Sequence, residues 1–129
     1  MKIKQLIPML ESDDMEGTMQ FYTETLGFRI FDVMEEDGKA YWCNLYRDDA
    51  EIMFTSRNAH SSSKKATLTG VLYFYPDDVD ALWQELKDRV KVEWEPQDFG
   101  YGMYDFAIRD NNGFILAFGQ TMDSLKHDS

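Results

Sequence analysis

The sequence has very few cysteine and histidine residues. In 129 residues it contains one cysteine, Cys43, and two histidines, His60 and His127. A single cysteine cannot form an intrachain disulfide, and Cys43 lies in an apolar and aromatic run, which predicts a buried, inert thiol. Both histidines fall outside the predicted strands, so we expect them at the surface. No catalytic constellation is therefore expected around them.

Basic side chains are also scarce. Thirteen lysines and arginines stand against 24 aspartates and glutamates, and the net charge is -11. Nucleic-acid binding requires basic side chains gathered on one face, so this balance argues against a nucleic-acid partner. It favours a cationic ligand or partner, with a merely soluble acidic surface as the alternative.

No hydrophobic run is long enough for a membrane span or a signal sequence. The opening MKIKQLIPML is a broken apolar run that ends at the acidic ESDD, so we expect no membrane association and a soluble, cytoplasmic protein. A chain of 129 residues with 43% hydrophobic residues is long enough for one domain and short for two. The expectation is a single domain over 1–129.

The stretch 101–120, YGMYDFAIRDNNGFILAFGQ, predicts a β-hairpin. Two runs rich in aromatic and aliphatic residues flank the turn-forming cluster 110–113. Side chains alternate along a strand, so Tyr104, Phe106 and Ile108 share one face. The opposite face begins with Met103 and Asp105 and is mixed in character, as the wall of a ligand site would be.

The remaining elements follow from hydrophobic spacing and turn residues. After a strand at 4–10, Asp13 or Asp14 caps a helix that ends at Gly27. Strands follow at 28–34, 40–47 and 50–56. The Ser- and Lys-rich stretch 57–69 predicts a linker or a lid. Beyond it we predict a strand at 70–75, a helix capped by Asp78, a strand at 90–95, the hairpin, and a disordered tail at 121–129.

The two halves of the chain repeat at an offset of 64 residues. Asp14 corresponds to Asp78 and Gln20 to Gln84, and the element order is β-α-β-β-β in both halves. One supersecondary unit is therefore used twice, at about 4–56 and about 70–120. We predict an α+β fold in which two tandem βαβββ modules form a curved mixed sheet around a cavity.

With this repeat in place, the sequence resembles the glyoxalase, bleomycin resistance and dioxygenase group of proteins, the vicinal oxygen chelate superfamily. Three segments carry the resemblance: IPMLESDDMEGTMQFYTETLGF, GVLYFYPDDVDAL and GYGMYDFAIRDNNGFILAF. In the last segment Asn111 replaces the usual proline and Phe114 the usual asparagine. The resemblance covers 4–120 and implies the fold described above.

The resemblance also implies where a metal would bind. Enzymes of the superfamily hold a divalent metal at four positions, which correspond here to Ile7, Met53, Val71 and Ala117. Isoleucine, valine and alanine have no donor atom, and a thioether is a poor ligand for such metals. We therefore expect no metal, no cofactor and no metal-dependent catalysis, which places the chain nearest the metal-free bleomycin resistance branch.

Strand alternation from those four positions predicts the lining of the cavity. Side chains facing the helices form the core: Leu45, Ile52, Phe54, Leu72, Phe74, Phe106, Leu116 and Phe118. The opposite face supplies the predicted ligand-binding residues Met9, Trp42, Asn44, Tyr46, Glu51, Met53, Tyr73, Tyr75, Met103 and Asp105, with Tyr101 at the rim. Several of these aromatic residues would serve equally well as space-filling groups.

Three functional hypotheses follow. The first is a metal-independent protein that binds a small cationic and aromatic molecule, such as an antibiotic of the bleomycin type, by stacking and cation-π contacts. The resemblance implies that such a protein is a homodimer. The second is a lyase, isomerase or dioxygenase of the same superfamily. The third is a protein-interaction module with a vestigial cavity.

Overall fold

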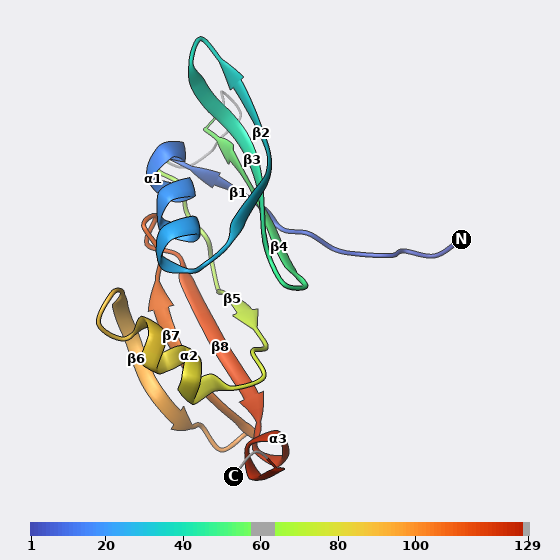
Figure 1. Ribbon diagram of the computed structural model, residues 1–129, viewed down its shortest axis with the longest axis vertical. Helices are drawn as coiled ribbons and strands as arrows, with labels where there is room; N and C mark the ends of the chain where they lie inside the picture. The colour runs from blue at the N-terminus through green and yellow to red at the C-terminus, as the bar shows by residue number, and fades with distance from the viewer. Residues whose placement is uncertain (58–63, 128–129) are drawn as a thin grey trace. The chain divides into compact units, whose positions relative to one another are not determined.

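The structure is a computed structural model that describes residues 1–57 and 64–127. The chain divides into two compact units, Met1–Thr67 and Leu68–Ser129, which we call module one and module two. Within the described residues each module forms a four-stranded mixed sheet with helices (Figure 1). This confirms the predicted α+β fold of two tandem βαβββ modules. His60 and the rest of 58–63, part of the predicted linker, lie outside the described residues.

Module one places its four described strands in the order β1-β4-β3-β2. Strand β1 runs parallel to β4, and the other neighbours are antiparallel. The strands are β1 (Met9–Ser12), β2 (Arg29–Glu36), β3 (Lys39–Arg47) and β4 (Ala50–Ser56). The β2–β3 and β3–β4 connections are tight turns, in which Asp37 and Asp48 adopt positive φ.

The predicted first strand at 4–10 was wrong at both ends. Residues before Met9 are not in a strand, and β1 continues to Ser12. The pairing partner decides these limits, since Met9 pairs with Met53 and Ser12 with Ser56 on β4. The buried Ser12 hydroxyl lies 2.7 Å from that of Thr18, so polar residues that look like a turn in the sequence are satisfied inside the strand.

The helical segment that follows β1 begins as an α-helix and continues as a π-helix. Asp14, rather than Asp13, caps α1 (Met15–Gln20) and accepts a hydrogen bond from the Gly17 amide at 2.9 Å. The chain then continues as a π-helical turn, η1 (Phe21–Thr25). The apolar residues Met15, Tyr22 and Leu26 are buried, and the Tyr22 ring contacts Phe28 and Phe54.

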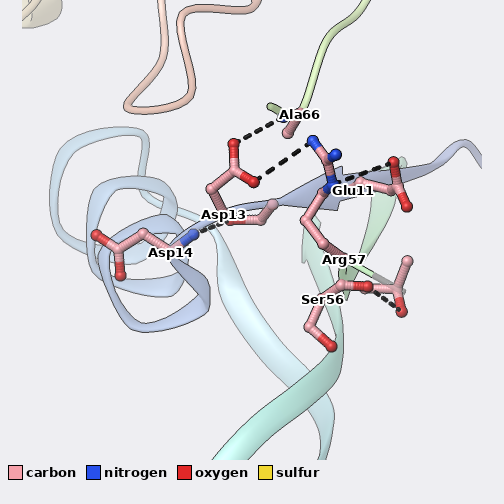
Figure 2. A network of polar contacts seen from close by, with 8 residues as sticks. Glu11, Asp13, Asp14, Ser56, Arg57 and Ala66 are labelled. Carbon is pink, nitrogen blue, oxygen red and sulfur yellow. Dashed lines mark hydrogen bonds and ion pairs between the residues drawn. The ribbon is translucent and has the colours of Figure 1, made fainter. Parts of the chain in front are cut away.

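Asp13 instead joins a polar network at the end of β4, shown in Figure 2. Its carboxylate accepts a hydrogen bond from the Ala66 amide at 2.7 Å and lies 3.5 Å from the Arg57 guanidinium. Arg57 also approaches Glu11 at 3.9 Å. The Asp13 carboxylate therefore contacts residues on both sides of 58–63 within module one.

Module two repeats the arrangement, with its four described strands in the order β5-β8-β7-β6. Strand β5 is parallel to β8, and the other pairs are antiparallel. The strands are β5 (Val71–Phe74), β6 (Lys91–Asp98), β7 (Met103–Arg109) and β8 (Ile115–Thr121). The predicted hairpin is β7 and β8, and the Asp110 carboxylate accepts hydrogen bonds from the Asn112 and Phe114 amides in its turn.

The helix of module two is α2 (Val79–Leu86), capped by Asp78 as predicted. The predicted disordered tail was wrong for most of its length, because Thr121 ends β8 and 122–127 form a short helix, α3 (Met122–His127). The Thr121 hydroxyl accepts from the Ser124 amide, and Gln120 donates to the Ser124 hydroxyl. These contacts order a segment that has no apolar stripe.

Each sheet has one face covered by helix, as alternation predicted. In module one Leu45, Ile52 and Phe54 are buried beneath α1. In module two Trp83 of α2 packs on Phe106, which stacks on Phe118. Leu116 is buried, while Leu72 and Phe74 are half-buried. We call the side of each sheet that faces away from the helix of its own module its open face. None of the helices in 1–57 and 64–127 has the length and apolar character that a membrane crossing needs.

Candidate functional site

Asp105 is a carboxylate buried in the middle of a sheet. It lies on β7, between β6 and β8, and its side chain has no exposed surface. Its neighbour Phe106 points toward α2, so alternation directs Asp105 to the open face of module two. An ionised carboxylate in such a position is strongly disfavoured unless donors surround it.

Three aromatic donors surround this carboxylate. The Tyr73 hydroxyl on β5 donates to Oδ2 at 2.7 Å, and the Tyr101 hydroxyl donates to the same oxygen at 2.6 Å. The Trp94 indole on β6 donates to Oδ1 at 2.8 Å. We call Asp105 with these three side chains the Asp105 cluster. Both carboxylate oxygens are therefore satisfied by neutral groups.

Small residues make room for the cluster. Gly119 on β8 lies beside Asp105, and a Cβ atom there would collide with the Tyr73 hydroxyl. Ala107 and Ala117 pair with each other across β7 and β8. Ala117 is one of the positions where the resemblance implies a metal ligand. In this chain Ala117 pairs with Tyr73, and Ala107 pairs with Trp94. The small alanine side chains leave space for the two large rings on the same face of the sheet.

The Asp105 cluster contains no basic side chain. Among the described residues the ion pairs involve other carboxylates, and none reaches Asp105. Burial and the hydrogen bond to Asp105 raise the pKa of Tyr73 far above its ordinary value. The bond to Asp105, followed by burial, raises the pKa of Tyr101. Both phenols therefore remain protonated donors at neutral pH.

An exposed aromatic group surrounds the buried cluster. Tyr75 is 73% exposed, Tyr101 59% and Phe99 43%. The ring centroids of Tyr73 and Tyr75 are 5.2 Å apart, those of Trp94 and Phe99 5.7 Å, and those of Phe99 and Tyr101 6.0 Å. The rings therefore form two groups in contact, Tyr73 with Tyr75 and Trp94 with Phe99 and Tyr101. They present aromatic faces to solvent beside a buried charge.

The structure thus brings together four predicted residues, Tyr73, Tyr75, Tyr101 and Asp105. Met103 lies on the same side of β7, two residues before Asp105, and is half-buried. Sequence reasoning missed Trp94 and Phe99. Phe99 precedes a Gly-Tyr-Gly turn, and its aromatic character beside Tyr101 was a signal that could have identified it.

The predicted residues of module one share the open face of their own sheet. Met9, Met53 and Asn44 lie in one cross-strand row, and Glu51 and Tyr46 pair in the next. The Asn44 amide donates to Glu51 at 2.9 Å, and Gln5 donates to the other Glu51 oxygen at 3.3 Å. Trp42 is half-buried on the same side. Their part in ligand binding stays a prediction.

The positions where the resemblance implies metal ligands do not fit a metal. Ile7 precedes β1, Met53 is half-buried in β4, Val71 begins β5 and Ala117 is buried in β8. These side chains offer three hydrocarbon groups and one thioether. In the described part of the chain there is also no group of three or more His, Cys, Asp or Glu side chains suited to a metal ion. Cys43 is buried, and burial raises the pKa of its thiol to about 11, as expected for an inert thiol.

Comparisons with solved structures agree on the fold. TioX from Micromonospora sp. ML1 is 15% identical with a TM-score of 0.76, over 92% of this chain and 100% of that one. TnmS3, an antibiotic binding protein from Streptomyces sp. CB03234, is 24% identical with a TM-score of 0.74, over 94% and 98%. Lactoylglutathione lyase from Agrobacterium tumefaciens is 19% identical with a TM-score of 0.64, over 91% and 93%.

The sequence itself identifies the family. Comparison with curated proteins gives no match. The model of the Glyoxalase/Bleomycin resistance protein/Dioxygenase superfamily, however, matches residues 6–118, which cover most of both modules and include every residue of the Asp105 cluster. The chain therefore belongs to the Glyoxalase/Bleomycin resistance protein/Dioxygenase superfamily.

Proposed function

We propose that this protein binds a small cationic and aromatic molecule and that Asp105 anchors the positive charge. The observation that carries the proposal is a fully buried carboxylate with three neutral donors and no cationic partner among the described residues. Neutral donors stabilise the ionised form without cancelling its charge. A ligand cation would supply the missing charge.

The surrounding rings support an aromatic ligand. A cation over the face of a tyrosine or tryptophan is attracted by about 0.5–2 kcal/mol, and a flat ring gains further by stacking. Tyr75, Phe99 and Tyr101 provide exposed faces beside Asp105. The net charge of -11 would draw cations toward the protein as a whole.

The proposal includes independence from metal. The side chains at the four implied positions, Ile7, Met53, Val71 and Ala117, cannot supply the oxygen or imidazole ligands that a Lewis-acid metal needs. TnmS3, an antibiotic binding protein of the same fold, makes sequestration of an antibiotic a natural form of this function. The alternative, a lyase, isomerase or dioxygenase, predicts stoichiometric divalent metal in the purified protein.

We also propose that the two modules act as one cytoplasmic domain that forms a homodimer. Ile30, Phe31 and Met34 on the edge strand β2 are exposed apolar side chains, and Phe31 is 73% exposed. A second copy would remove such surface from water. Light scattering at micromolar concentration tests this, and a monomer would contradict it.

The function is tested by titration with metal-free bleomycin, a cationic aromatic antibiotic, using calorimetry and tryptophan fluorescence. We expect saturable binding with one ligand per chain, and a loss of at least about tenfold in affinity for Asp105→Asn. Glu95→Gln is the matched control, because it removes one exposed carboxylate from β6. Trp42→Phe and Trp83→Phe variants would leave Trp94 as the responding tryptophan.

Equal affinities of Asp105→Asn and wild type would contradict the anchoring role. Absence of binding at millimolar ligand would remove bleomycin itself from the proposal, and a panel of aromatic amines would then test the cation site directly. Metal analysis of the same preparation tests the enzyme alternative, which predicts stoichiometric divalent metal.

A further inference from the structure

The three donors to Asp105 are held with very different rigidity. Tyr73 lies on β5, where it pairs with Ala117, and its hydroxyl occupies the space left by Gly119. Trp94 lies on β6, paired with Ala107. Both side chains are half-buried. To move the Tyr73 hydroxyl or the Trp94 indole away from Asp105, a strand or a packed ring would have to move.

Tyr101 is held differently, on a turn whose backbone is fixed by the Gly100 amide donating to Asp98 at 2.8 Å and the Gly102 carbonyl accepting from the Met122 amide at 3.0 Å. It lies between β6 and β7, and the glycines on either side, Gly100 and Gly102, have φ of +86° and +87°. No atom lies within 4 Å of where a Cβ would stand on either glycine. The side chain is 59% exposed, and its ring stacks on Phe99, which is itself 43% exposed. A rotation of the side chain would therefore release its hydroxyl.

The departure of Tyr101 would free one acceptor site on Asp105. Its hydroxyl shares Oδ2 of Asp105 with Tyr73 at 2.6 Å and 2.7 Å, whereas Trp94 uses Oδ1. A phenol is a neutral donor, and an ammonium N–H forms a charge-assisted bond to carboxylate that is roughly twice as strong. Replacing the Tyr101 hydroxyl by an ammonium N–H as donor to Oδ2 would therefore exchange a weaker hydrogen bond for a stronger one.

We propose that Tyr101 is a displaceable donor and that the ligand group replacing it on Asp105 is a protonated amine with at least one N–H. This inference rests on the proposed function and names its ligand class. Primary, secondary and tertiary ammonium groups can donate to Oδ2. A quaternary ammonium cannot donate, and its methyl groups would bury the carboxylate with one donor fewer.

The proposal makes Tyr101 a determinant of selectivity. In the free protein its hydroxyl competes with the ligand, so the apparent affinity is reduced by the fraction of molecules in which it has left Asp105. Tyr101→Phe removes this competition while keeping the aromatic ring. It should strengthen the binding of N–H cations, in contrast to the loss expected when an ordinary binding residue is altered.

The experiment uses calorimetry with 2-naphthylmethylammonium, its N,N,N-trimethyl analogue and neutral 2-naphthylmethanol. For wild type we expect the primary ammonium to bind about tenfold or more tightly than the trimethyl analogue. Tyr101→Phe should bind the primary ammonium about three- to tenfold more tightly than wild type. Tyr73→Phe, the matched control, should show no gain because its hydroxyl lies against Gly119.

Two outcomes overturn the inference and leave the proposed function intact. One is equal binding of the two cations, both tighter than the alcohol. The other is weaker binding of the primary ammonium by Tyr101→Phe, which would make the hydroxyl a fixed ligand contact. If neither cation binds more tightly than the alcohol, the proposed function fails together with the inference.

A measurement without ligand gives an independent result. Because Tyr101 is exposed and flanked by glycines, Tyr101→Phe should lower the melting temperature by less than about 1 °C, whereas Tyr73→Phe should lower it by about 4 °C or more. A large fall for Tyr101→Phe would show a donor too firmly held to be displaced, and would overturn the inference.

Discussion

The indole Nε1 of Trp94 donates to Oδ1 of Asp105 at 2.8 Å. This contact depends on an irregularity in the pairing of β6 with β7. Val92 pairs with Ile108, and Trp94 then pairs with Ala107, the next residue of β7. The shift turns Trp94 to the opposite side of the sheet from Val92, where it meets Asp105. A bulge thus completes the donor set of the buried carboxylate.

Replacing Asp105 by asparagine should destabilise the fold. An asparagine side chain has one acceptor oxygen and one NH₂ group, so at least one of the three present donors would face a donor. We expect a loss of about 1–3 kcal/mol in the free energy of unfolding, measured by urea denaturation. Glu95→Gln should leave the midpoint unchanged, and an unchanged midpoint for Asp105→Asn would contradict the hydrogen-bonding account.

The contact between Gly119 and the Tyr73 hydroxyl predicts a non-additive pair. Gly119→Ala places a Cβ against that hydroxyl and should cost about 1–3 kcal/mol of stability through overpacking. In a Tyr73→Phe background the hydroxyl is absent, so the alanine should cost clearly less. A double-mutant cycle by chemical denaturation measures the coupling. Simple additivity of the two changes would argue against the contact.

Gln120 should be important for the stability of module two. Its side chain is 4% exposed, accepts from the Val79 amide at 2.7 Å and donates to the Ser124 hydroxyl at 3.1 Å. Gln120→Leu leaves a buried amide at the start of α2 without its acceptor, which should cost about 1–3 kcal/mol. Gln84→Leu, at an exposed position of α2, is the control and should be nearly neutral in thermal denaturation.

Tyr104 predicts a pH dependence in the alkaline range. Its hydroxyl donates to Asp80 at 2.6 Å, and burial followed by this bond raises the pKa of Tyr104 from 10.0 to about 12. The folded protein holds this proton more tightly than the unfolded chain. The associated stability is therefore complete below pH 10 and is lost as the pH rises toward 12.

The Tyr104→Phe variant tests that dependence. Its free energy of unfolding should fall less steeply between pH 10 and pH 12 than that of wild type, because the raised pKa has been removed. Tyr73 and Tyr101, whose pKa values are also raised, contribute the same slope to both proteins. Identical slopes would show that Tyr104 ionises normally in the folded state.

Much of the site followed from patterns a few residues long. Strand alternation placed Asp105 on the side opposite Phe106, and the turn composition of 110–113 located the hairpin that carries it. The caps Asp14 and Asp78 began the two helices and revealed the repeat. These features depend on backbone geometry and local hydrogen bonds, which neighbouring residues decide among themselves.

Other features required partners distant in sequence. Alternation from Val92 assigns Trp94 to the helix side, and the bulge that reverses it exists because β6 must pair with β7. The limits of β1 were decided by its register with β4, and the order of 122–127 by Gln120 and Thr121. The arrangement of donors around Asp105 likewise depends on the pairing of several strands and on the turn that carries Tyr101.

The sequence by itself therefore determined the repeated βαβββ modules, the helix caps, the core faces and the side of the sheet on which Asp105 lies, because these are set by local periodicity and capping. The tertiary structure decided that Asp105 is satisfied by Tyr73, Trp94 and Tyr101, and that only neutral donors reach it among the described residues. Pairing between strands brings these groups within hydrogen-bonding distance, and no local pattern encodes such a distance.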